Sequence, residues 1–140
     1  MEEICPFCSK EIKERAFKEG KLAFVLLSTP RVAPGHLLII PKRHVQRLSE
    51  LNNREVEEIF TLLAKYQDKM LNKLGTGTEI RQNYKPYFEN SKTHVNHFHF
   101  HLVPRKEADE IATRVDIYRK ALYQNLSGEE EESILKLLSD

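Results

Sequence analysis

The apolar positions of the chain predict one long helix and several strands. Between Leu48 and Gly75, apolar side chains recur every three or four residues, which is the spacing of one helix face. Asn52, followed three residues later by Glu55, forms a capping box near the start of this helix, and Gly75 is expected to end it. Strands are expected over 22–27, 36–40 and 78–84, each bounded by turn residues, and the first two are expected to pair.

A further strand is predicted over residues 95–103, where histidines alternate with apolar residues. His97, His99 and His101 follow the period of a β-strand, so one face would carry three imidazoles over about 13 Å. Pro104 is expected to end the strand. One histidine on a strand face is usually structural, but three in register indicate acid–base, nucleophilic or metal chemistry, because imidazole titrates near neutrality.

After the histidine segment the apolar pattern weakens, but it still allows two helices. Within residues 108–124, apolar positions recur at intervals of four, four and three, which permits a helix. Residues 127–130 form a capping box with an acidic first turn, so a second helix is expected to follow. These elements predict an α+β fold. We expect a single domain over residues 1–140, with a C-terminal helical extension over about residues 106–140.

Charge and hydropathy argue against two classes of partner. The chain has 22 basic and 21 acidic residues and a net charge of +1, so no surface for long nucleic acids is expected. No apolar run approaches the length of about 18 residues that a membrane span requires. The charged start, Met1-Glu2-Glu3, does not resemble a secretion signal. We therefore expect a cytoplasmic protein without a membrane partner.

Both cysteines lie close to the start of the chain. Cys5 and Cys8 are the only two, and they stand as Cys-Pro-Phe-Cys within residues 1–10. In a reducing compartment this spacing predicts a metal knuckle or a redox pair, and not a structural disulfide. A tetrahedral zinc ion would need two further ligands.

The segment His97-Phe-His-Phe-His-Leu-Val103 resembles the signature of the histidine triad family, in which three histidines alternate with apolar residues. The stretch 34–42, Pro-Gly-His-Leu-Leu-Ile-Ile-Pro-Lys, resembles the other recurring segment of that family. The resemblance covers about residues 4–105 and implies a mostly antiparallel sheet packed with one long helix, and commonly a twofold homodimer.

Two branches of the family share features with the chain. The stretch 27–36 and the exit Val-Pro-Arg at 103–105 resemble the Fhit-type, dinucleoside polyphosphate-cleaving branch. The cysteine pair resembles the Hint-type branch. The sequence does not choose between them.

For the cysteine pair, the resemblance implies that His44 and His97 supply the two missing ligands. With Cys5 and Cys8 they would form a structural Cys₂His₂ zinc site that ties the amino terminus to the histidine strand. A redox pair would not explain His44.

The middle histidine is the expected nucleophile. Its neighbours on the same face leave His99 best placed to be oriented and assisted, and the resemblance implies that this residue attacks the α-phosphate of a nucleotide. The product of that step is a nucleotidyl-histidine. The resemblance also implies that His101 contacts the phosphoryl oxygens, and we place His97 with these two in the catalytic set. His36 is expected either in the pocket wall or as a hydrogen-bonded core histidine.

The loop before the triad departs from the family pattern. Many members carry Gly-Gln-Ser/Thr there, whereas this chain has Lys92-Thr93-His94. Thr93 and His94 are candidates to replace the missing hydroxyl, and a solvated loop is the equal alternative. Asn83 is a candidate for phosphate binding and Ser28 for ribose binding.

We therefore expect a nucleotide hydrolase or transferase acting on dinucleoside polyphosphates or nucleoside phosphoramidates. One alternative is a nucleotide-binding protein of the same family with little or no turnover. Another is a metalloenzyme that uses the three histidines as metal ligands. The second alternative is disfavoured, because neither an Asp–His pair nor a closely following Glu completes a familiar metal set.

Overall fold

The computed structural model describes residues 4–139, so the charged start at residues 1–3 lies outside the described part. The chain divides into two compact units, Met1–Glu107 and Ala108–Asp140. In chain order the elements of the first unit are η1 (Pro6–Cys8), α1 (Lys10–Arg15), β1 (Lys18–Glu19), β2 (Ala23–Leu27), β3 (Leu37–Pro41), η2 (Leu48–Glu50), α2 (Asn53–Met70), β4 (Gly77–Arg81) and β5 (Phe100–Arg105).

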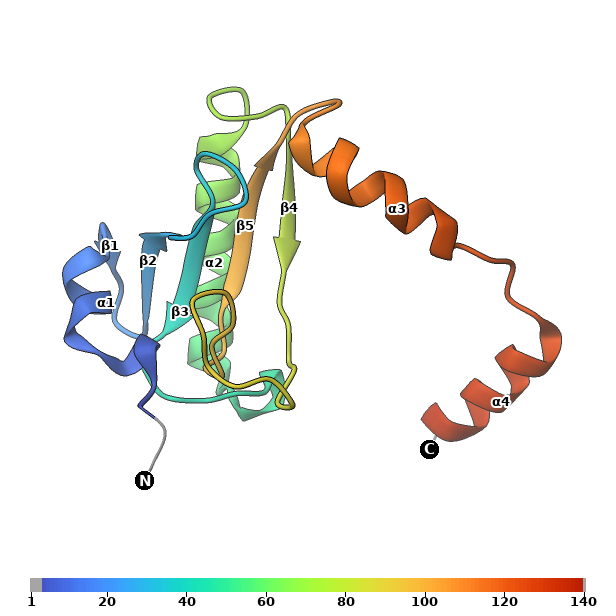
Figure 1. Cartoon of the computed structure of the whole chain (residues 1–140). Helices are drawn as coiled ribbons and strands as arrows, with labels where there is room; N and C mark the ends of the chain where they lie inside the picture. The colour runs from blue at the N-terminus through green and yellow to red at the C-terminus, as the bar shows by residue number, and fades with distance from the viewer. Residues whose placement is uncertain (1–3, 140) are drawn as a thin grey trace. The chain divides into compact units, whose positions relative to one another are not determined.

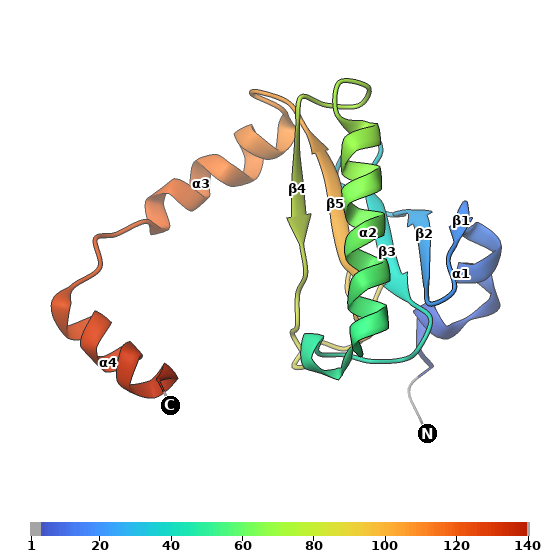
Figure 2. The same ribbon diagram turned by 180° about the vertical axis from the view of Figure 1, so that it is seen from behind.

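The first unit is one antiparallel sheet with α2 packed across it (Figures 1 and 2). The strand order is β1-β2-β3-β5-β4, and β2 pairs with β3, as expected. One core cluster lies between α2 and one face of the sheet. A second is formed by the alternate side chains of β2 and β3, which point to the opposite face, together with Ile12 of α1. The expected α+β fold is confirmed.

The start of α2 agrees with its sequence signal, but its end does not. Asn52 Oδ1 accepts the Glu55 amide and Glu55 Oε1 accepts the Asn52 amide, each at 2.9 Å, which is the predicted capping box. The residues from 48 to 50 form a separate 3₁₀ turn. The helix ends at Met70 and not at Gly75, because Leu71 adopts an extended backbone (φ −63°, ψ 132°) and Asn72 after it is left-handed (φ 66°).

The histidine strand is shorter at its start than predicted. β5 begins at Phe100, which pairs with Ile39, so the expected strand over residues 95–99 is wrong. Continuing the ladder beyond Ile39 would involve Pro41 of β3, which has no amide proton to donate. The Pro41 carbonyl oxygen instead accepts a hydrogen bond from the ring of His97 at 2.8 Å. A side chain thus takes the place of a ladder bond.

Pro104 does not end the strand, because β5 continues to Arg105. Pairing between β3 and β5 stops at Leu102, whereas pairing with β4 continues and sets Pro104 opposite Thr78. Beyond Leu102 one side of β5 is no longer part of a ladder, and proline is tolerated at such an edge.

The second unit consists of short helical segments. They are η3 (Ala112–Asp116), a π-helical turn, then α3 (Ile117–Arg119), η4 (Lys120–Leu122) and α4 (Gly128–Leu138). Ser127 caps α4 by accepting the Glu130 amide at 3.1 Å, as its sequence predicted. Within residues 4–139, no helix combines the length and apolar character needed to cross a membrane. The twofold homodimer stays a prediction.

Candidate functional site

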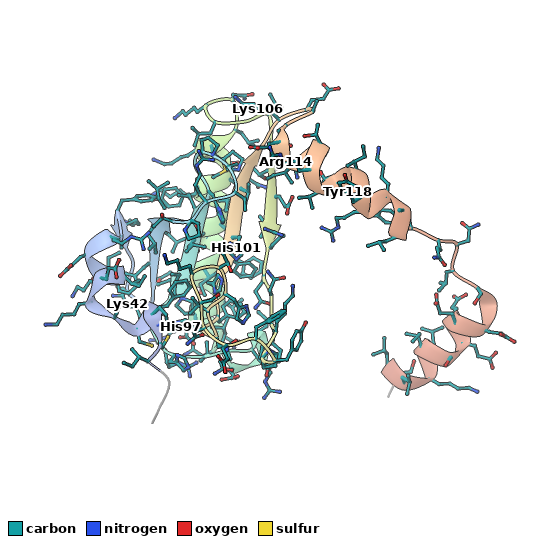
Figure 3. The ribbon with its side chains drawn as sticks, in the orientation of Figure 1. Lys42, His97, His101, Lys106, Arg114 and Tyr118 are labelled. Carbon is teal, nitrogen blue, oxygen red and sulfur yellow. The ribbon has the colours of Figure 1, made fainter. Side chains whose placement is uncertain are left out.

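A cavity of about 440 Å³ opens on the sheet face that carries His101. In Figure 3, His101 lies over the middle of the sheet, and His97 lies closer to the amino-terminal segment. Folding brings most of the residues expected from sequence to this cavity: its lining includes Ser28, His36, Asn83, Thr93, His94, His99 and His101. His97 is not among the lining residues.

The cavity also contains residues that sequence reasoning did not select. Phe7, Arg15, Arg31 and Arg81 line it. For Arg81 a signal was present, because it lies two residues before Asn83, and alternate residues of a strand share one face. Arg15 lies in a segment without a strand or motif pattern. Arg31 lies in the family-like stretch 27–36, but that resemblance assigned it no role, so only the fold shows the position of either side chain.

His99 is held as a neutral base. Its Nδ1 lies 2.6 Å from the carbonyl oxygen of His97, so Nδ1–H donates and Nε2 keeps a free lone pair. Burial lowers the pKa of His99 below its ordinary value of 6.5, and the charge of His94 adds to this effect. The ring packs edge-on against Phe7, with centroids 5.0 Å apart. A buried, neutral and oriented imidazole is the form that can attack phosphorus.

His101 is held in the opposite tautomer by a chain of hydrogen bonds. The Val32 amide donates to His36 Nδ1 at 3.2 Å, so the proton of neutral His36 is on Nε2. That Nε2–H donates to His101 Nδ1 at 2.9 Å. His101 therefore carries its own proton on Nε2. His36 is a hydrogen-bonded histidine and part of the pocket wall at once, and His101 offers a neutral N–H donor.

Protonation of these two histidines predicts how stability depends on pH. Burial is the main cause that lowers the pKa of His101 to about 3 and that of His36 to about 4, from 6.5. Below pH 6.5 the unfolded chain takes up protons that the folded chain excludes. The free energy of unfolding should therefore fall as the pH is lowered from 6.5 toward 4, by at most about 1.4 kcal/mol per pH unit for each group.

Urea unfolding at a series of pH values measures this slope. The His101→Asn variant should show a shallower slope below pH 6.5, because it lacks one of the two groups. It keeps Cys5, Cys8, His44 and His97, the four residues called the Cys/His cluster below. Equal slopes in both proteins would show that His101 is not kept neutral by the fold.

Cys5, Cys8, His44 and His97 form a second constellation, which lies close enough together to bind a metal ion. Their ligand atoms all lie within 4.8 Å of one another. His97 Nδ1 lies 3.1 Å from His44 Nδ1 and 3.4 Å from Cys5 Sγ, and Cys8 Sγ lies 3.4 Å from His44 Nδ1. Among the described residues, His99 and His101 are not part of such a group. The arrangement therefore does not favour a metal held by all three histidines.

Separate parts of the fold orient the two histidine ligands. His97 Nε2–H donates to the Pro41 carbonyl, which leaves the Nδ1 lone pair facing the two thiols. His44 follows Arg43, whose guanidinium makes an ion pair of 2.7 Å with the buried carboxylate of Glu55 on α2. This ion pair fixes the loop that carries His44.

The pKa of the Cys8 thiol is raised to about 11 by burial, together with a hydrogen bond and the charge of Cys5. Cys8 would therefore become a thiolate only beside a positive charge such as a metal ion.

Comparisons with known proteins agree on one family. A family model of the HIT domain matches residues 9–108. The chain is 30% identical over 103 residues to the asymmetrical bis(5'-nucleosyl)-tetraphosphatase of Schizosaccharomyces pombe, covering 74% of this chain and 56% of that protein. It therefore spans little more than half the length of that relative.

Two further comparisons are consistent with this match. The chain is 28% identical over 110 residues to the adenosine 5'-monophosphoramidase of Saccharomyces cerevisiae, covering 76% of this chain and 66% of that enzyme. The crystal structure of a HIT family protein from Bacillus anthracis superposes with a TM-score of 0.71 at 24% identity, covering 96% of this chain and 94% of the other. This structural likeness concerns the fold alone.

Proposed function

Because the chain belongs to the HIT domain family, we propose that it is a nucleotide hydrolase or transferase that forms a nucleotidyl-histidine on His99. Its proposed substrates are dinucleoside polyphosphates or nucleoside phosphoramidates, which correspond to the activities named for two of its relatives. One observation carries the proposal: the 2.6 Å contact between His99 Nδ1 and the His97 carbonyl leaves Nε2 unprotonated on a ring that lines the cavity.

The reaction proceeds in two displacements. His99 Nε2 attacks the α-phosphorus, a nitrogen–phosphorus bond forms, and the bond from phosphorus to the leaving group breaks. The imidazole gains positive charge in this step, and the His97 carbonyl stabilises it by accepting the Nδ1–H. Water then attacks phosphorus and gives up one proton to solvent, the nitrogen–phosphorus bond breaks, and neutral His99 and a nucleoside monophosphate are released. Transfer to another acceptor would follow the same course.

His101 has a supporting role in both displacements. Its Nε2–H is the donor available to phosphoryl or leaving-group oxygens as their negative charge grows in the transition state. His36 orients this donor without contacting substrate itself.

We propose that the metal held by the Cys/His cluster is a structural zinc ion. A tetrahedral zinc with bonds of about 2.3 Å to sulfur and about 2.0 Å to nitrogen separates two nitrogens by about 3.3 Å, and sulfur from nitrogen by about 3.5 Å. The corresponding distances here are 3.1 Å and 3.4 or 3.5 Å. Bound zinc would clip η1 to the histidine segment, and so hold Phe7 against the ring of His99.

Quenching with an alkaline denaturant tests the covalent intermediate, because the adduct survives in base. Wild-type protein mixed briefly with labelled diadenosine tetraphosphate and labelled adenosine phosphoramidate in turn should trap one adenylyl group per chain. The adduct should be labile in acid and stable in base, as a phosphoramidate is, and His99→Ala should trap none. Tight nucleotide binding without a trapped group or turnover would instead favour the nucleotide-binding alternative.

A further inference from the structure

The cavity that holds His99 has an unbalanced charge. Four cationic side chains line it, and among its described lining residues none is acidic. Arg15 already uses one of its hydrogen-bond donors within the fold, because its guanidinium donates to the Leu27 carbonyl at 2.7 Å. The remaining cations are Arg31, Arg81 and Lys92. The hydrogen bonds from the Val32 amide to His36 and from His36 to His101 assign neutral tautomers to these two imidazoles, so the cations supply the positive charge that a polyanion would meet.

Arg81 is the cation set most directly beside the reacting groups. It is the last residue of β4 and is paired in register with His101 of β5, so the two side chains rise from the same face of the sheet. His101 is thus flanked by Arg81 on one strand and by His36 on the other side. The charge of Arg81 contributes to the lowered pKa of both histidines, which places it within electrostatic reach of both.

The guanidinium of Arg81 is only partly compensated within the fold. Its Nε makes an ion pair of 3.0 Å with Glu79 Oε1, and the Arg81 side chain keeps 41% of its surface exposed. Glu79 also makes an ion pair of 2.7 Å with Arg105. Glu79 therefore does not neutralise Arg81 alone, and the exposed part of the Arg81 guanidinium can meet a ligand in the cavity that it lines.

We propose that Arg81 contacts the substrate and binds the phosphate next to the one attacked by His99, which makes the site selective for leaving groups that carry phosphate. This inference rests on the proposed function and deepens it. His99 and His101 engage the α-phosphate. Arg81 lies across the strand pair from His101, where the next phosphate of the chain would lie. Its planar fork suits phosphate oxygens. An amine leaving group of a phosphoramidate offers no such oxygens.

The test compares two substrates in the full-length protein. Arg81→Gln should lower kcat/KM for diadenosine tetraphosphate by about 10²-fold, the effect of removing one donor from a developing charge. It should change kcat/KM for adenosine phosphoramidate far less. Arg81→Lys, which keeps the charge and loses the fork, should fall between wild type and Arg81→Gln on the first substrate. Equal losses on both substrates, or no loss on either, would overturn the proposal.

A binding experiment separates this proposal from the hydrolase proposal. Calorimetry with inorganic tripolyphosphate requires no turnover, and Arg81→Gln should weaken that binding by about tenfold or more. Arg114→Gln is the matched control, because it removes one exposed charge from the second unit, where Arg114 pairs with Glu110. Arg81-dependent binding without turnover of any nucleotide would leave Arg81 as a phosphate ligand and refute the hydrolase. Binding unchanged in Arg81→Gln, or weakened equally by Arg114→Gln, would refute the role of Arg81.

Discussion

Replacing His99 by alanine should lower kcat by about 10⁴-fold or more, because the change removes the atom that attacks phosphorus. Nucleotide binding should survive, since the cations and polar side chains of the cavity remain. Steady-state kinetics with diadenosine tetraphosphate and adenosine phosphoramidate measure the first effect. Calorimetry with AMP measures the second.

The matched comparison is His101→Ala, which removes a donor and leaves the nucleophile in place. It should lower kcat by about 10²- to 10³-fold, and therefore less than His99→Ala. Near-wild-type turnover by His99→Ala, or an adenylyl group that maps to His101 or His94, would show that the nucleophile has been wrongly assigned.

Loss of the Cys/His cluster should have the largest effect on stability. Cys8→Ser removes one of four ligands, and the protein should no longer retain zinc. A ligand present at about 1,000 times its dissociation constant stabilises the folded state by about 4 kcal/mol, and we expect a loss of that order in the free energy of unfolding. Chelation of the wild-type metal should reproduce the loss, because both changes remove the link between η1 and the histidine segment.

Elemental analysis of protein purified without chelator, combined with urea unfolding, measures both effects. Ser9→Ala is the matched control, since Ser9 hydrogen-bonds within the same turn, to the Pro6 carbonyl at 2.7 Å, but is not a ligand. It should keep the metal and most of the stability. A wild-type protein that holds no zinc even after zinc is added back would refute the zinc site.

The features that the sequence predicted correctly depend on residues close together along the chain. The capping box of α2 needs only Asn52 and Glu55, whose hydrogen bonds form as soon as the first turn forms. Ser127 caps α4 for the same reason. The helix period alone places Ile59, Leu63 and Met70 on one buried face of α2, although Phe60 beside them stays half exposed. Such local signals leave few alternatives.

The residues at which helices and strands begin and end depended on groups that folding brings together. β5 starts at Phe100 because His97 takes the carbonyl of Pro41, 56 residues away. Leu71 and Asn72 end α2 through extended and left-handed backbone conformations that the apolar periodicity does not predict. Periodicity indicates which face a residue occupies, but the point at which a ladder stops is set by competition for its backbone groups.

Tertiary structure also decided the chemistry of each histidine. The sequence determined that three histidines would alternate, yet three similar rings have three different roles. The hydrogen bond to the Pro41 carbonyl directs Nδ1 of His97 toward the thiols. The hydrogen bond to the His97 carbonyl leaves Nε2 of His99 unprotonated. The hydrogen bond from His36, 65 residues away in sequence, leaves the proton of His101 on Nε2, where it can be donated. An imidazole has two nitrogens and one proton when neutral, so its role follows from whichever partner the fold supplies to the other nitrogen.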